Sequence, residues 1–146
     1  MSFLGLVDKV FVVFGIANKR SVAYHIAQRL LNEGAKVVCS VRSEARREAV
    51  GKLLPECDIH VCDVEQDGEI TALADAIRKK HPVVHGLLHS IAFASYESFS
   101  GKFHEVSRKD FVQCVSVSCY SLIAIANAFK EVLDRRASVV TISIST

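Results

Sequence analysis

The chain alternates short apolar runs rich in β-branched residues with longer segments of helical periodicity, and this alternation limits the fold more than any other feature. The short runs lack a regular apolar–polar alternation, as in KVFVVF at residues 9–14, so a strand built from them is buried on both faces. The longer segments place apolar side chains three and four residues apart, as an amphipathic helix does. We therefore predict an α/β fold in which helices cover both faces of a parallel sheet.

The order of the elements also predicts the topology. The strands are expected at Lys9–Phe14, Lys36–Val41, Asp58–Cys62, Val84–His89 and Ser138–Ser143. The helices are expected at Ser21–Glu33, Ser43–Leu54, Gln66–Lys80 and Ser107–Leu133. Right-handed crossovers then give a three-layer, doubly wound Rossmann fold with strand order 3-2-1-4-5 and a ligand site beyond the carboxyl ends of strands one and four. We expect residues 1–146 to form a single domain of this kind.

Charge and composition exclude several classes. Eighteen basic and 16 acidic residues leave a net charge of +2 without a basic run, which disfavours nucleic acid as a partner. We expect no membrane span, because no run of 18 apolar residues occurs, and no secretory signal. The odd number of cysteines predicts free, buried thiols in a cytoplasmic protein. Zinc is the alternative, but the C-x4-C pairs lack finger spacing, so no metal is expected among Cys39, Cys57, Cys62, Cys114 and Cys119.

The loop after the first strand is a candidate phosphate site. A loop between a strand and a helix presents backbone N–H groups and the positive end of the helix dipole, which suits a pyrophosphate. Gly15 would permit the tight turn, Ser21 would cap the helix or hydrogen-bond a phosphate, and Val22 is expected to help hold the cofactor. The standard G-x-G-x-x-G pattern is absent, so an ordinary turn with a serine cap is the alternative.

The end of the second strand indicates which dinucleotide is preferred. An NAD site usually has an acidic residue there, whereas this chain has Arg42, followed by Arg46 and Arg47. Guanidinium groups suit a 2′-phosphate, so NADPH is slightly favoured over NADH. The alternative is a solvated start of the next helix.

The ends of the third and fourth strands complete the predicted site. Asp63, with the neighbouring N–H of Val64, could bind an adenine, although an aspartate here is equally typical of a helix cap. After strand four, the chain is expected to approach the ribose and phosphates of the cofactor through Ser90, Ile91 and Ala92.

Three motifs together resemble a known family. They are Gly15-x5-Ser21-Val22-Ala23, Cys62-Asp63-Val64 and His89-Ser90-Ile91-Ala92-Phe93-Ala94. The chain resembles the bacterial enoyl-acyl-carrier-protein reductases, divergent short-chain dehydrogenases/reductases, from Phe3 to about Ser143. The resemblance implies NADPH- or NADH-dependent reduction of the trans-2 double bond of enoyl thioesters on acyl carrier protein during fatty-acid elongation. It also implies that Ser143 lines the nicotinamide side.

The sequence departs from that family in its catalytic residues. The family has a Tyr-x6-Lys pair beyond strand five, but Tyr24, Tyr96 and Tyr120 have no lysine seven positions later. We therefore expect no catalytic residue in this chain, which would be the cofactor-binding half of a longer protein and inactive alone. The alternatives are another short-chain reductase acting on a carbonyl, or a non-catalytic nucleotide-binding module.

The last predicted helix is apolar around most of its circumference between Phe111 and Leu133. Such a helix is buried on two sides. One side is expected to face the sheet and the other a second subunit, because related reductases form tetramers through their long helices. We expect a homotetramer for the complete protein; the alternative is that the missing half covers this surface.

Overall fold

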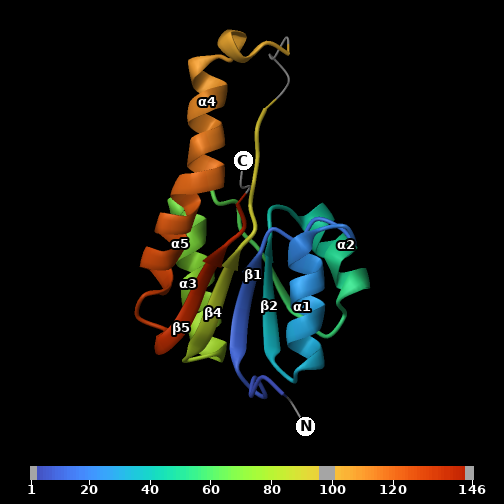
Figure 1. The fold of residues 1–146 in the computed structure, drawn as a ribbon. Coiled ribbons are helices and arrows are strands. Elements are labelled where there is room, and N and C mark those ends of the chain that lie inside the picture. Colours follow the sequence, from blue (N-terminus) through green and yellow to red (C-terminus); the bar gives the residue numbers. More distant parts are fainter. Residues whose placement is uncertain (1–2, 96–100, 144–146) are drawn as a thin grey trace.

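A computed structural model describes residues 3–95 and 101–143 and confirms the predicted topology. Its five strands form one parallel sheet in the order β3-β2-β1-β4-β5 (Figure 1). The strands are β1 (Val10–Phe14), β2 (Lys36–Val41), β3 (Asp58–Val61), β4 (Val84–His89) and β5 (Leu133–Thr141). The α-helices are α1 (Val22–Asn32), α2 (Glu44–Leu53), α3 (Asp67–Lys80), α4 (Arg108–Val115) and α5 (Ser121–Phe129), with a short 3-10 helix at Phe103–Glu105.

Helices cover both faces of the sheet: α1 and α2 lie on one face, and α3 and α5 lie on the other (Figure 1). Alternate residues of β1 enter the two cores, Val12 and Phe14 on the α3–α5 side and Val13 on the α1–α2 side. All three side chains are almost completely buried. The unbroken apolar runs of the sequence therefore reflect strands that are buried on both faces.

The fifth strand is longer than the sequence predicts. It begins at Leu133 instead of Ser138, and the preceding helix ends at Phe129 instead of Leu133. Leu133 pairs with Val84, and a bulge follows before Ser138 pairs with Gly86. Arg135 and Arg136 near the start of this strand are exposed, as the edge of a sheet allows, so their charge is compatible with strand structure.

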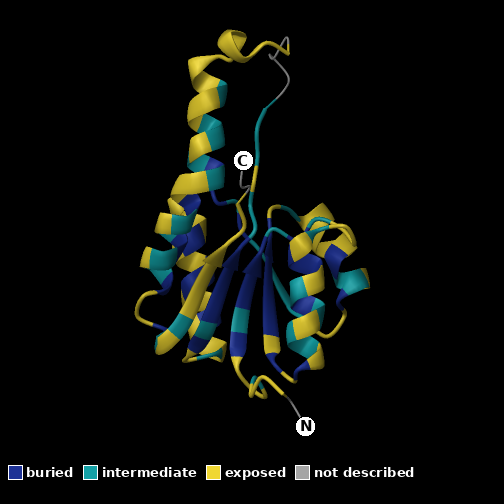
Figure 2. Cartoon of the chain, viewed as in Figure 1, coloured by how far each residue is buried: buried dark blue, intermediate teal, exposed yellow. Residues whose placement is uncertain are grey.

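The long helical segment between Arg108 and Phe129 consists of α4, a π-helical turn at Ser116–Tyr120 and α5. The expectation that its whole length packs on the sheet is wrong for α4, which has no buried residue and extends beyond the strands (Figures 1 and 2). By length and composition alone, this 22-residue segment could cross a bilayer. The absence of an unbroken apolar run did not reveal this segment because polar residues interrupt it.

The five cysteines are free, as predicted, but they are not all buried. Cys39 and Cys62 are buried, Cys57 and Cys114 are half-buried, and Cys119 is exposed. The prediction of burial is therefore wrong for Cys119, which lies in the π-helical turn on the uncovered side of the segment.

A buried histidine connects three elements at the carboxyl end of the sheet. The Ser121 hydroxyl donates its proton to the carbonyl oxygen of Val117 at 2.7 Å, so His89 Nε2 must donate to Ser121 Oγ, also at 2.7 Å. His89 Nδ1 then accepts a hydrogen bond from the Thr141 hydroxyl at 3.1 Å. Both ring nitrogens are engaged in the neutral tautomer, and burial lowers the pKa of His89.

We expect stability to fall as the pH drops below about 6.5, the ordinary pKa of histidine. The folded chain resists protonation of His89 whereas the unfolded chain accepts the proton, so acid favours unfolding. Burial also lowers the pKa of His81, which contributes in the same direction. Urea unfolding at about pH 7.5 and 5.5 should show a smaller pH dependence for His89→Gln than for the unchanged chain.

His25→Gln is the matched control, because His25 is exposed on α1. Its pH dependence should equal that of the unchanged chain. An undiminished pH dependence in His89→Gln would contradict the assignment.

Candidate functional site

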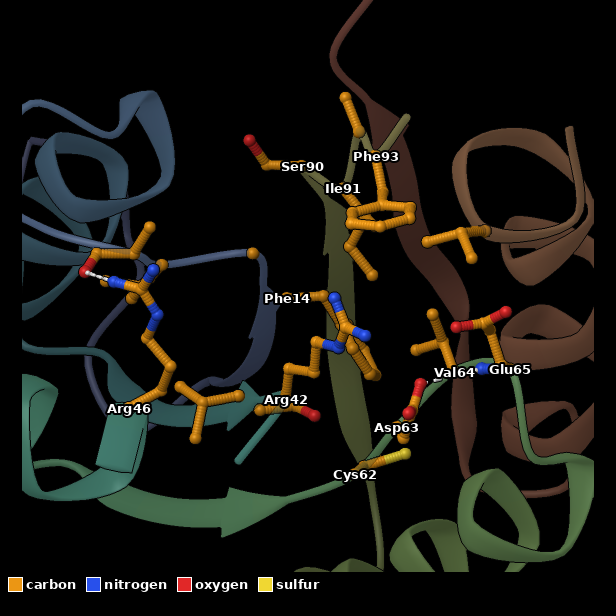
Figure 3. Close-up of a pocket in the computed structure, with 17 residues that line it drawn as sticks. Phe14, Arg42, Arg46, Cys62, Asp63, Val64, Glu65, Ser90, Ile91 and Phe93 are labelled. Atoms are coloured by element: carbon orange, nitrogen blue, oxygen red, sulfur yellow. Dashed lines mark hydrogen bonds between the residues drawn. The ribbon is translucent and has the colours of Figure 1, made fainter. Parts of the chain in front are cut away.

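A pocket lies beyond the carboxyl ends of β1 to β4, where the strand order reverses (Figure 3). This is the place predicted for a ligand in a doubly wound sheet. The predicted residues that line it are Gly15, Arg42, Asp63, Val64, Ser90, Ile91 and Ala92. Ser21, Val22 and Ser143 do not line it. Ser143 follows β5 and is exposed, so the structure does not bring it to the pocket.

Gly15 makes the closest backbone approach in the pocket. It follows β1 with a φ of +95°, and a Cβ atom at this position would lie 1.9 Å from the carbonyl oxygen of Ser90. The N–H of Ser90 in turn donates to the carbonyl oxygen of Phe14 at 3.1 Å. Only glycine fits here, so the loops after β1 and β4 meet directly and form one wall.

The Ser21 side chain stabilises the loop instead of capping the helix. Its Oγ accepts hydrogen bonds from the N–H groups of Ala17 and Asn18, both at 3.0 Å, and makes no cap bond to α1. The expectation of a side-chain cap is therefore wrong, because the loop turns back onto the hydroxyl. The first turn of α1 still contributes the N–H groups of Val22 and Ala23, for which a helix provides no acceptor of its own.

The arginines predicted after β2 separate into two groups. The Arg42 guanidinium lies 4.9 Å from the centre of the Phe93 ring, a cation–π contact across the pocket (Figure 3). Arg46 also lines the pocket, and its Nη1 donates to the carbonyl oxygen of Ala17 at 3.0 Å. Arg47 instead pairs with Glu44 at 3.4 Å, outside the pocket.

Asp63 shapes the turn after β3 and is not the helix cap, which is Gln66. Its Oδ1 accepts the N–H of Glu65 at 3.1 Å, and its own N–H donates to Glu69 Oε2 at 2.7 Å. These bonds hold the carboxylate at the pocket wall beside Val64. Next to it, burial raises the pKa of Cys62 to about 12, so this thiol stays neutral.

Sequence reasoning missed Phe93 and Val117 as pocket residues. The Ser118 hydroxyl accepts the N–H of Phe93 at 3.0 Å and donates to its carbonyl oxygen at 3.1 Å. This pair of bonds fixes the segment after β4 against the π-helical turn, which also carries Val117. The motif containing Phe93 is visible in the sequence, but no periodicity signals a π-helical turn.

Replacing Gly15 should test the contact between the first and fourth strand loops. Gly15→Ala combines an unfavourable φ with a clash against backbone, so we expect a loss of more than about 2 kcal/mol in the free energy of unfolding. Gly5→Ala is the matched control, because Gly5 has a φ of +62° with nothing within 4 Å of the added Cβ. Equal losses in urea denaturation would contradict the contact.

The family described as enoyl-(acyl carrier protein) reductase matches residues 15–146. Enoyl-[acyl-carrier-protein] reductase [NADPH] FabI of Staphylococcus aureus is 38% identical over 142 residues, which cover 94% of this chain and 56% of the relative. Enoyl-[acyl-carrier-protein] reductase [NADH] FabI of Enterococcus faecalis is 36% identical over 139 residues, with the same two coverages. The chain spans about half the length of the curated relatives it matches.

Solved structures agree with this grouping. The Bacillus cereus enoyl-acyl carrier protein reductase with NADP+ and indole naphthyridinone matches with a TM-score of 0.88 at 35% identity, over 93% of this chain and 55% of that one. The enoyl-[acyl-carrier-protein] reductase (NADH) of Aquifex aeolicus matches with a TM-score of 0.86 at 29% identity, over 93% and 55%. The resemblance carried by the three sequence motifs is confirmed, and the chain belongs to the enoyl-(acyl carrier protein) reductase family.

Proposed function

We propose that this chain binds NADPH or NADH in the pocket at the carboxyl end of the sheet, and that residues 1–146 form a single NAD(P)-binding Rossmann domain. The observation that carries the proposal is the approach of Gly15 to Ser90, which leaves room for no side chain between the two loops. The pocket is lined by backbone and small side chains at the place where this fold binds dinucleotides. The names of the relatives, which include NADPH and NADH, support the same cofactors.

Each predicted residue has a role in this proposal. The diphosphate would be bound by the loop from Gly15 to Ser21 and by the N–H of Val22. The adenine would be recognised by Asp63 and Val64. The segment after β4 would bind the ribose and phosphates through the backbone of Ser90, Ile91 and Ala92. In the complete protein, Ser143 would line the nicotinamide side.

The charges in the pocket favour NADPH slightly over NADH. Arg42 follows β2 directly, where an NAD-specific site usually has a carboxylate, and Arg46 lines the same wall. Two guanidinium groups there would stabilise a 2′-phosphate. The contact of Arg42 with Phe93 holds the guanidinium over the pocket.

For the complete protein we propose NAD(P)H-dependent reduction of the trans-2 double bond of enoyl thioesters linked to acyl carrier protein, in fatty-acid elongation. NADPH or NADH, when bound, would supply a hydride for C3 of the enoyl group. The enolate that develops at the thioester oxygen needs a preorganised donor. The tyrosine and lysine that serve the family in this step have no counterpart at Tyr-x6-Lys spacing among these 146 residues. The role of this chain's own residues is to bind and orient the cofactor.

We also propose a cytoplasmic homotetramer for the complete protein, with no nucleic-acid or membrane partner. Support comes from the apolar side chains that α4 and the following turns expose, which would be covered in an assembly. They are Phe111, Val112, Val115, Tyr120 and Ile123. The free thiols agree with a reducing compartment.

Fluorescence titration should show tighter binding of NADPH than of NADH. Arg42→Ala removes a charge-assisted contact to the 2′-phosphate, so it should weaken NADPH binding by about 10-fold or more and NADH binding much less. Arg47→Ala is the matched control, because Arg47 pairs with Glu44 outside the pocket, and it should leave both affinities unchanged. Tighter binding of NADH, or equal losses for both cofactors in Arg42→Ala, would contradict the role of Arg42.

The 146-residue chain should bind cofactor without catalysing reduction. With a crotonyl thioester as substrate, absorbance should show no oxidation of NADPH above the rate without protein, because the tyrosine and lysine pair is not in this sequence. Turnover by the purified chain would mean that its own residues perform the chemistry.

A further inference from the structure

The pocket at the carboxyl end of the sheet has walls of opposite charge. Arg42 and Arg46 line the side formed after β2. Asp63 and Glu65 line the side formed after β3, with Val64 between them. Figure 3 shows Arg46 and Glu65 at opposite sides of the pocket. A ligand with an anionic group at one place and hydrogen-bond donors at another would therefore bind here in one direction.

The Glu65 carboxylate is held by a residue from a distant helix. Gln113, half-buried on α4, donates a hydrogen bond from its Nε2 to Glu65 Oε1 at 3.0 Å. The N–H of Glu65 donates to Asp63 Oδ1 at 3.1 Å, which holds the backbone of the same turn. Side-chain and backbone contacts thus fix where this carboxylate lies, although 48 positions separate it from Gln113 in the sequence.

Both carboxylates retain acceptor capacity for a ligand. An ionised carboxylate offers about four lone-pair positions on its two oxygens and has no donor. One amide N–H of the protein occupies a position on Glu65 Oε1, and another occupies a position on Asp63 Oδ1. The two side chains can therefore accept further hydrogen bonds from a molecule in the pocket that they line.

This wall suits an amino group and opposes a carbonyl oxygen in the same place. Adenine has an exocyclic amino group with two N–H donors at C6, whereas hypoxanthine has a carbonyl oxygen there. Between two carboxylates the amino group can donate both hydrogens, but the carbonyl oxygen meets acceptors. A polar group that loses water without gaining a partner costs free energy, so a wall of acceptors rejects the carbonyl base.

We propose that Glu65 selects adenine as the base of the bound cofactor, and that Gln113 is the residue that positions it. One hydrogen of the adenine amino group goes to Asp63 and the other to Glu65. This assignment rests on the binding of NADPH or NADH proposed above. It adds that base specificity depends on α4, a helix with no buried residue of its own.

Fluorescence titration with NADPH and with its hypoxanthine analogue, deamino-NADPH, tests the assignment, because both have the same reduced nicotinamide and the same phosphates. The unchanged 146-residue chain should bind NADPH about 10-fold or more tighter than the analogue. Glu65→Gln should lower this preference by about 5-fold or more, and it should bind deamino-NADPH more tightly than the unchanged chain does. With Gln113 still donating to Oε1, the new amide N–H group replaces the other oxygen and can donate to the carbonyl of hypoxanthine.

Two further variants separate base recognition from a structural role. Gln113→Ala releases the Glu65 side chain, so the preference for NADPH should fall by about 2-fold or more, without a gain in affinity for deamino-NADPH. Glu48→Gln is the matched control, because Glu48 is exposed on α2 and does not line the pocket, and the preference should equal that of the unchanged chain. A hydrogen bond that served only to hold α4 would weaken both cofactors equally when lost and leave the preference unchanged.

Two results would overturn the assignment while cofactor binding stands. One is equal affinity of the unchanged chain for NADPH and deamino-NADPH. The other is an undiminished preference in Glu65→Gln or, if circular dichroism shows that this variant does not fold, in Gln113→Ala. If the unchanged chain bound neither cofactor, the proposed function would fail and the assignment with it.

Discussion

The contact between the backbones at Gly15 and Ser90 is the constraint on which the candidate site depends. Strands β1 and β4 are hydrogen-bonded neighbours, so their carboxyl ends must separate into loops that leave in different directions. At Gly15 the loop passes so close to Ser90 that no Cβ fits between them. Without this contact the start of α1 would stand away from the segment after β4, and the pocket would lose one wall. The proposed dinucleotide site therefore rests on a glycine, although the familiar glycine-rich pattern is absent.

The opposite wall is held by polar contacts in the same region. His89 ends β4, and its two ring nitrogens tie β4 to the end of β5 and to the beginning of α5. One turn earlier, Ser118 fixes Phe93 by bonding to both of its backbone groups. Phe93 in turn lies over Arg42, so the chain of contacts leads from the buried histidine to the guanidinium proposed to select the cofactor.

The sequence was sufficient to predict the sheet order and the meeting of the strand ends. Strands buried on both faces have continuous apolar runs, and the handedness of crossovers leaves few topologies. Gly15, Asp63 and Ser90 each follow a strand of the sheet. A parallel arrangement therefore places them at the same end of the sheet, however the side chains pack. The family motifs added the identity of the fold, which the chain's relatives confirm, and the expectation of a nicotinamide cofactor, which the names of those relatives support.

What the sequence could not predict depends on loop geometry and on contacts between distant residues. The hydroxyl of Ser21 bonds to its own loop, because the loop geometry, not its sequence, decides where the backbone N–H groups point. Strand β5 begins early because Arg135 and Arg136 can reach solvent at an edge. The contact of Arg42 with Phe93 joins segments that share no local pattern, and α4 is exposed although the apolar stretch predicted to be buried begins within it at Phe111.

The most direct test of the central claim is an amide NMR titration of the 15N-labelled chain with NADPH. Binding in the pocket predicts saturable shifts at the amides of Gly15, Val64 and Ile91, which belong to three strand ends. The amide of Gly51, in the groove between α2 and β3, should not move. Spectra that do not change, or shifts confined to residues outside the pocket, would contradict the account.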